Sequence, residues 1–132
     1  MPGGRPRTGE IALSKRRGDK VVYAGSLSYR EHVDLFVRSV PFVRAKKGSV
    51  KFFSTGGGDN ANSIKALDCE LQTGIRLFWF PEEEKLFRFL ASCSVAVLPS
   101  GNDMTRRMGI PIKLLDYLSV SLPVVARYQS YV

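Results

Sequence analysis

The feature that most constrains the fold is a strict alternation of short apolar runs with segments of helical periodicity. The apolar runs, which are candidate strands, cover residues 20–24, 50–54, 75–80, 95–98 and 124–126. The helical segments between them cover residues 31–45, 61–72, the stretch after Pro81, and 112–119. Strands that alternate with helices at these lengths predict an α/β fold, in which a parallel sheet has helices on both faces and right-handed crossovers.

Four single residues refine this prediction. Pro41 falls inside a helical pattern, so we expect the helix to kink or restart there. Gly74 follows the second helical segment and is expected to cap it in the left-handed conformation. Trp79 and Phe80 close the third apolar run, and packing in the core is the stronger explanation for aromatic side chains in such a run.

The cysteines and the hydropathy pattern bear on the compartment. Cys69 and Cys93 lie in apolar helical patterns without the spacing of a disulfide framework, so both are expected to be reduced and buried. The sequence has no apolar window long enough to span a membrane and no signal-peptide pattern. These features predict a cytoplasmic protein.

The positive charge is concentrated at the N-terminus. The net charge is +8, and residues 1–20 carry +4 of it, since six cations there oppose Glu10 and Asp19. A basic tail can bind nucleic acid or anionic lipid. No aromatic residue is interleaved with these cations, as single-strand binding would require. Residues 1–19 are therefore interpreted as a solvated basic linker or tail, and no specific nucleic acid is expected as a partner.

A candidate anion site follows the fourth apolar run. The loop after residue 98 contains Ser, Gly, Asn, Asp and two arginines, and it opens a helix. Loops after parallel strands lie at the carboxyl edge of the sheet, where ligands bind, and a helix N-terminus attracts anions. The glycine turn at residues 55–60 lacks the Lys-Ser/Thr of a P-loop, and two separated cysteines with one histidine do not form a metal site.

Ordered segments of the chain resemble the C-terminal, donor-binding domain of GT-B glycosyltransferases, of the type called glycosyltransferase group 1 or family 4. VVYAGSLSYREHVDLFVRSV and VKFFSTGGGDN resemble its first two strands with their glycine turns. IRLFWFPEEEKLFRFLASCSVAVLPS resembles its third strand, a helix and the fourth strand. GIPIKLLDYLSVSLPVVA resembles the segment written G-x-P-x-K-x-x-E-Y-x-x-x-x-x-P-V-V-A. The resemblance covers about residues 20–126 and implies a Rossmann-like sheet that forms half of a GT-B fold.

The resemblance also implies a function. Residues 20–132 would be a nucleotide-sugar-binding domain, truncated at its C-terminus, that holds a nucleotide-diphosphate sugar for glycosyl transfer to an unknown acceptor. The donor would be a substrate, and no cofactor or metal is implied. The acceptor-binding N-terminal domain would be the missing partner, so the isolated fragment is expected to be inactive. Any membrane contact is expected to be peripheral and made through the full-length enzyme.

Site residues follow from the resemblance position by position. Asp116 would accept hydrogen bonds from the donor ribose. Lys113 and the N-terminus of its helix would lie near the diphosphate, and Gly25 would allow close backbone approach. The remaining candidates are Ile112, in the first turn of that helix, and three loop cations: Arg30, Arg106 and Arg107.

Three positions depart from the family pattern. Met108 stands where the family has the first glutamate of its E-x7-E motif, Ser26 follows the glycine where arginine is common, and Glu31 stands where lysine is common. These departures favour an alternative, a non-catalytic nucleotide-binding or interaction domain of the same fold.

Overall fold

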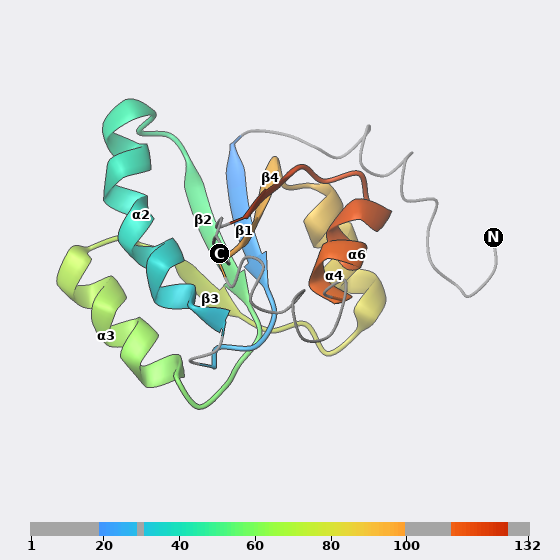
Figure 1. Ribbon diagram of the computed structural model, residues 1–132, viewed down its shortest axis with the longest axis horizontal. Coiled ribbons are helices and arrows are strands. Elements are labelled where there is room, and N and C mark those ends of the chain that lie inside the picture. The colour runs from blue at the N-terminus through green and yellow to red at the C-terminus, as the bar shows by residue number, and fades with distance from the viewer. Residues whose placement is uncertain (1–18, 29–30, 100–111, 127–132) are drawn as a thin grey trace, which may run out of the picture.

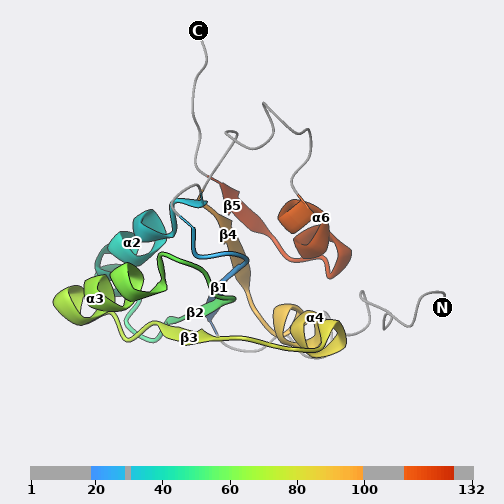
Figure 2. The ribbon, with the colours of Figure 1, turned by 90° about the horizontal axis from the view of Figure 1, so that it is seen from below.

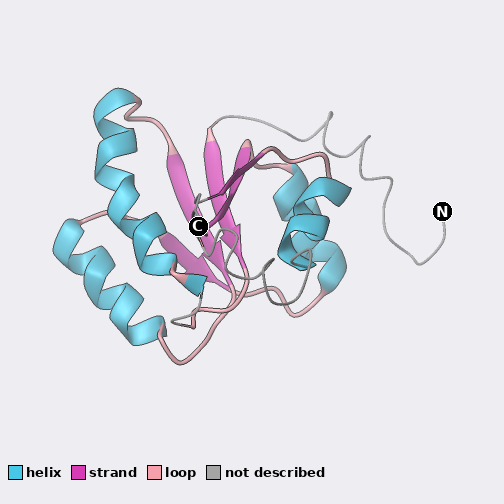
Figure 3. Cartoon of the chain, in the orientation of Figure 1, coloured by secondary structure: helices cyan, strands magenta, loops and turns pink. Residues whose placement is uncertain are grey.

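The sheet is entirely parallel. The computed structural model describes residues 19–28, 31–99 and 112–126. Its strands are β1 (Lys20–Ala24), β2 (Lys51–Thr55), β3 (Arg76–Phe78), β4 (Val95–Leu98) and β5 (Val124–Ala126). They are ordered β3-β2-β1-β4-β5, with Val22 opposite Phe53 in β2 and opposite Ala96 in β4. Figure 3 shows this sheet between its helices. The predicted parallel α/β architecture is confirmed.

Helices cover both faces of the sheet, as the sequence predicts. The helices are α2 (Val33–Lys46), α3 (Ala61–Leu71), α4 (Glu83–Ala91) and α6 (Ile112–Ser119). One buried cluster joins the sheet to α4 and α6, and a second joins it to α2 and α3. Figures 1 and 2 show the two layers from perpendicular directions. Successive strand residues enter opposite clusters, since Val22 packs toward α4 and α6 whereas Tyr23 packs toward α2 and α3.

An aromatic cluster holds β2, β3 and α4 together. The ring of Phe53 lies 5.1 Å from that of Phe89 and 6.0 Å from that of Phe78, and both pairs meet edge to face. Phe80 adds a fourth ring, 5.0 Å from Phe78. Edge-to-face pairs stabilise a core beyond the area that they bury, so short β3 is fixed by side-chain packing as well as by its hydrogen bonds.

Helix α2 continues through Pro41 without the restart that was one of the two predicted outcomes. Both sides of the proline are anchored to the core. Before it, Val37 and Val40 are fully buried. After it, the Arg44 guanidinium donates to the carbonyl oxygen of Thr73 and lies 5.2 Å from the centre of the Phe52 ring. These contacts stabilise the helix on both sides of Pro41, although proline removes one backbone hydrogen bond.

Some local predictions are wrong. Gln72, at φ 52°, is the left-handed C-cap of α3, so Gly74 lies beyond the cap. Trp79 is 70% exposed because β3 ends at Phe78, and a residue beyond the strand no longer has to face the core. Cys69 is exposed on α3, whereas Cys93 is buried as expected. Neither cysteine forms a disulfide, and the Cys93 thiol donates to the carbonyl oxygen of Phe89 at 3.3 Å.

Candidate functional site

The strand order places a topological switch point between β1 and β4. From β1 the chain crosses outward to β2 and β3, then returns by α4 on the other face to β4. The connections leave the carboxyl ends of β1 and β4 in opposite directions, and sheets with this arrangement typically bind their ligands in a crevice at this edge. Gly25, at the end of β1, lies at this crevice.

Tyr117 ties α6 to this switch point. Its side chain is fully buried, and its hydroxyl accepts a hydrogen bond from the Ala24 backbone N–H at 2.9 Å. The same hydroxyl is 3.1 Å from the carbonyl oxygen of Val97, to which it can donate. Burial raises the pKa of Tyr117, so the phenol keeps its proton at neutral pH. One side chain therefore fixes α6 against the carboxyl ends of both strands.

Tyr117→Phe is expected to lower the free energy of unfolding by about 1–3 kcal/mol, because the buried Ala24 N–H loses its acceptor. Urea unfolding followed by circular dichroism measures this change. Tyr23→Phe is the matched comparison, since the Tyr23 hydroxyl donates to Ser26 in a turn that is closer to solvent. Equal stability of Tyr117→Phe and the wild-type protein would contradict the anchoring role of the hydroxyl.

The turns after β1 and β2 pack backbone against backbone. The Gly25 N–H donates to the Thr55 carbonyl oxygen at 2.9 Å, and the Gly56 N–H donates to that of Phe78 at 2.8 Å. A Cβ atom added to Gly56 would lie 2.9 Å from the Gly25 carbonyl carbon and closer still to its oxygen. The second glycine turn therefore packs against Gly25, and the close approach of the donor to Gly25 stays a prediction.

Glu31 is buried beside the two buried tyrosines of this region. Glu31 is only 6% exposed. Burial is the main cause that raises the pKa values of Tyr23 and Tyr117, and the negative charge of Glu31 raises both further. In the sequence, Glu31 is distinguished only as a departure from the family pattern. Its place in the structure is at the start of the α2 segment, on the inner side of the fold.

The structure brings some of the predicted site residues together. Asp116 is half-buried on α6, next to Tyr117, and its charge also contributes to the raised pKa of that tyrosine. Ile112 and Lys113 begin α6. Gly25 and α6 therefore flank the same crevice, joined through the hydrogen bond from Ala24 to Tyr117. Arg30, Arg106, Arg107 and Met108 lie outside the described residues.

Two kinds of feature are absent from residues 19–28, 31–99 and 112–126. No three His, Cys, Asp or Glu side chains gather there into a possible metal site. None of the helices in those ranges combines the length and hydropathy that crossing a bilayer needs.

The parallel sheet, its switch point and the anchored helix define a Rossmann-like half of a GT-B glycosyltransferase fold. Residues 18–130 match the family described as Glycosyl transferases group 1. The chain belongs to this family, and the resemblance read from the sequence is confirmed.

Individual relatives agree with this assignment. The chain is 24% identical over 114 residues to the amylovoran biosynthesis glycosyltransferase AmsK of Erwinia amylovora, covering 84% of this chain and 28% of that protein. The pneumococcal O-GlcNAc transferase GtfA, in complex with UDP and GlcNAc, superposes with a TM-score of 0.74 at 17% identity, covering 91% of this chain and 22% of that one. The catalytic domain of cholesterol-α-glucosyltransferase from Helicobacter pylori gives 0.68 at 20% identity, covering 83% and 65%. The chain thus spans about a quarter of the length of the first two relatives.

Proposed function

We propose that this chain is the donor-binding half of a glycosyltransferase and holds a nucleotide-diphosphate sugar at the crevice between β1 and β4. The observation that supports the proposal is the anchoring of α6 at the switch point by Tyr117, whose hydroxyl contacts Ala24 and Val97 next to the carboxyl ends of β1 and β4. Membership of the group 1 family supports transfer of a glycosyl group as the reaction. A similar fold was solved with UDP and GlcNAc, which supports a nucleotide sugar as the ligand.

Two parts of the donor, its ribose and its diphosphate, have candidate partners on this chain. Asp116 would accept hydrogen bonds from the ribose hydroxyls. The first turn of α6 presents backbone N–H groups without intrahelical partners, and the helix dipole favours a diphosphate there. Lys113, Arg106 and Arg107 would add positive charge that stabilises the departing diphosphate. The acceptor would be held by a second domain, and residues 1–19 would be the linker toward it.

Asp116→Ala is expected to weaken nucleotide binding about tenfold or more, because a charged acceptor of a hydrogen bond is typically worth about 1.5–3 kcal/mol. Titration calorimetry with UDP, GDP and ADP measures the affinity, and the melting temperature should not change. Glu84→Ala is the control, since Glu84 pairs with Arg88 on the exposed side of α4.

The outcomes separate the proposal from its alternative. No binding of any of the three nucleotides to the wild-type chain, at protein concentrations near the millimolar range, would overturn donor binding by this chain. That result would favour an interaction domain of the same fold, as Met108 and Ser26 suggest. Equal affinity in Asp116→Ala and Glu84→Ala would remove Asp116 from the site.

A further inference from the structure

The C-terminal end of α2 projects beyond the core. Residues 41–49 are all exposed except Arg44, and they lie between buried Val40 and buried Val50. We call this segment, Pro41–Ser49, the α2 tip. The Lys47 ammonium pairs with the Asp19 carboxylate at 3.0 Å, next to the start of β1, so the tip lies at the amino edge of the sheet.

Fixed contacts hold the α2 tip in place. The Arg44 guanidinium donates to the Thr73 carbonyl oxygen and lies over the Phe52 ring. The Lys47 backbone N–H donates to the Val43 carbonyl oxygen at 2.9 Å, which closes the last turn of the helix. The tip is therefore a preformed projection, and binding a partner through it needs no further ordering of the backbone.

The α2 tip exposes an aromatic side chain among cationic side chains. Phe42 is 77% exposed and Val43 is 36% exposed. Residues 38–51 contain five cations and no acid. Arg38 pairs with Asp34 and Lys47 with Asp19, and Arg44 contacts Thr73 and Phe52, so Lys46 and Lys51 carry the charge that a partner would meet. An exposed phenylalanine leaves apolar area in water that a partner could bury, and the surrounding charge selects a partner that is negatively charged.

We propose that the α2 tip docks on an anionic lipid surface. Phe42 would insert at the boundary between the headgroups and the acyl chains, and Lys46 and Lys51 would contact the lipid phosphates. A stable protein partner typically buries about 800 Å² on each side around an apolar centre. The α2 tip offers the apolar side chains of a single projecting helix end, which fit a bilayer interface better than a broad protein surface.

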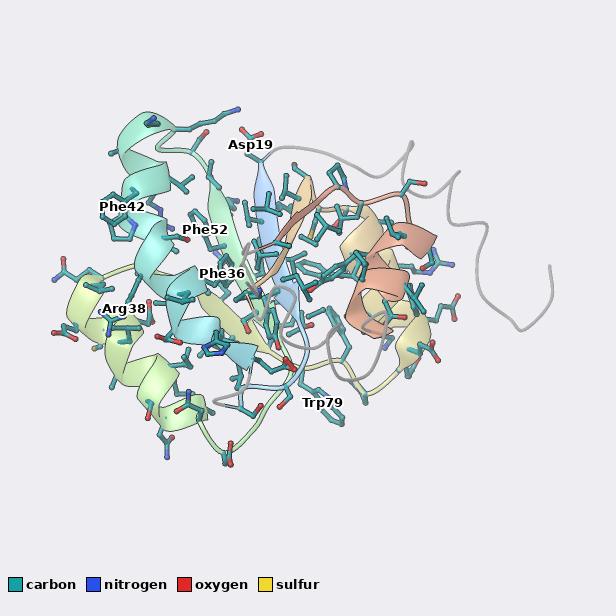
Figure 4. All side chains as sticks on the ribbon, viewed as in Figure 1. Asp19, Phe36, Arg38, Phe42, Phe52 and Trp79 are labelled. Atoms are coloured by element: carbon teal, nitrogen blue, oxygen red, sulfur yellow. The ribbon has the colours of Figure 1, made fainter. Side chains whose placement is uncertain are left out.

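The position of the α2 tip allows membrane docking and donor binding at the same time. Strands of a parallel sheet have their amino ends at one edge and their carboxyl ends at the other, so the α2 tip and the crevice at Gly25 lie at opposite edges. Figure 4 shows Phe42 near one end of the sheet and Trp79, which follows the carboxyl end of β3, near the other. Docking through the tip would leave the crevice open. The proposal does not depend on donor binding.

Vesicle flotation with the full chain tests the proposal. The vesicles are either pure phosphatidylcholine or an equal mixture of phosphatidylcholine and phosphatidylglycerol. Phe42→Ala is expected to lower partition onto the mixed vesicles about tenfold, since burying a phenylalanine contributes about 1.5–3 kcal/mol. Lys46→Gln is expected to lower it about fivefold, because one cation near an anionic surface is worth about 1 kcal/mol.

Matched controls isolate the α2 tip from the rest of the chain. Trp79→Ala removes another exposed aromatic, 70% exposed, at the opposite edge, and Lys85→Gln removes another exposed cation on α4. Neither should change partition by more than about twofold. All four variants keep the basic residues 1–18, so vesicle binding by that segment cancels from the comparison.

Three results would overturn the proposal. The first is a wild-type chain that does not float with the mixed vesicles. The second is equal partition of Phe42→Ala and Trp79→Ala onto the mixed vesicles. The third is equal partition of Lys46→Gln and Lys85→Gln. Retention of the wild-type chain on immobilised polyglutamate but not on mixed vesicles, with weaker retention of Phe42→Ala and Lys46→Gln than of their controls, would assign the α2 tip to an acidic protein surface instead.

Discussion

Gly56→Ala is expected to lower the free energy of unfolding by at least about 3 kcal/mol, from backbone strain and forced backbone shifts together. Gly56 has φ of 131°, a conformation that side chains with a Cβ rarely adopt. The added carbon would also collide with the carbonyl group of Gly25, which is backbone and cannot move aside as the end of a flexible side chain can. Urea unfolding followed by circular dichroism measures the loss.

Gly57→Ala is the matched control for this prediction. A Cβ atom at Gly57 meets nothing within 4 Å, and no positive φ is recorded there. Its free energy of unfolding should remain within about 0.5 kcal/mol of the wild-type value, as for most surface substitutions. If the two variants were equally stable, the backbone packing of the turns after β1 and β2 would be contradicted.

Phe53→Ala is expected to lower the free energy of unfolding by about 3–5 kcal/mol, the usual range for truncating a buried phenylalanine. Phe53 is 7% exposed and its ring meets both Phe78 and Phe89 edge to face. Truncation would leave a cavity between β2, β3 and α4, and the short strand β3 would lose the packing against its one aromatic side chain, Phe78. Chemical denaturation with the same probe measures the change.

Phe42→Ala provides the comparison for the core substitution. Phe42 is 77% exposed, so its removal should change stability by about 0.5 kcal/mol or less. This result would also show that the variant used in the vesicle experiment is folded. A loss at Phe42 as large as that at Phe53 would contradict the exposure of the α2 tip.

The fold was predictable because each element carries its own periodic pattern. The apolar runs at β1, β2 and β4 are buried on both faces, which a parallel sheet requires, and the helices show one apolar face each. The predictions failed where an apolar run in the sequence is longer than the strand that it forms. Trp79 belongs to the same apolar run as β3 but lies beyond the end of the strand and is exposed. Its predicted burial assumed a longer strand, and local pattern does not define where a strand ends.

The candidate site was less predictable because it depends on long-range contacts. The role of Tyr117 arises from Ala24, which is 93 residues earlier in the chain. In the sequence, Tyr117 is only one more apolar position of a helix. The signal that could have found it is its hydroxyl, since a phenol on a buried face needs a hydrogen-bond partner. The contact between Gly25 and Gly56 is likewise invisible to local pattern, although both glycines were noted.

The packed glycine turns restrict which groups can hold a phosphate at this edge. The backbone N–H groups of Gly25, Leu27 and Gly56 each donate to a carbonyl oxygen of Thr55, Gly57 or Phe78. Donors that are occupied inside the protein cannot also cradle an anion, so these turns differ from a phosphate-binding loop in which amides point at the ligand. These three amides would therefore not hold the diphosphate of the proposed donor, and its negative charge would be met by other groups, such as the N-terminus of α6 and cationic side chains.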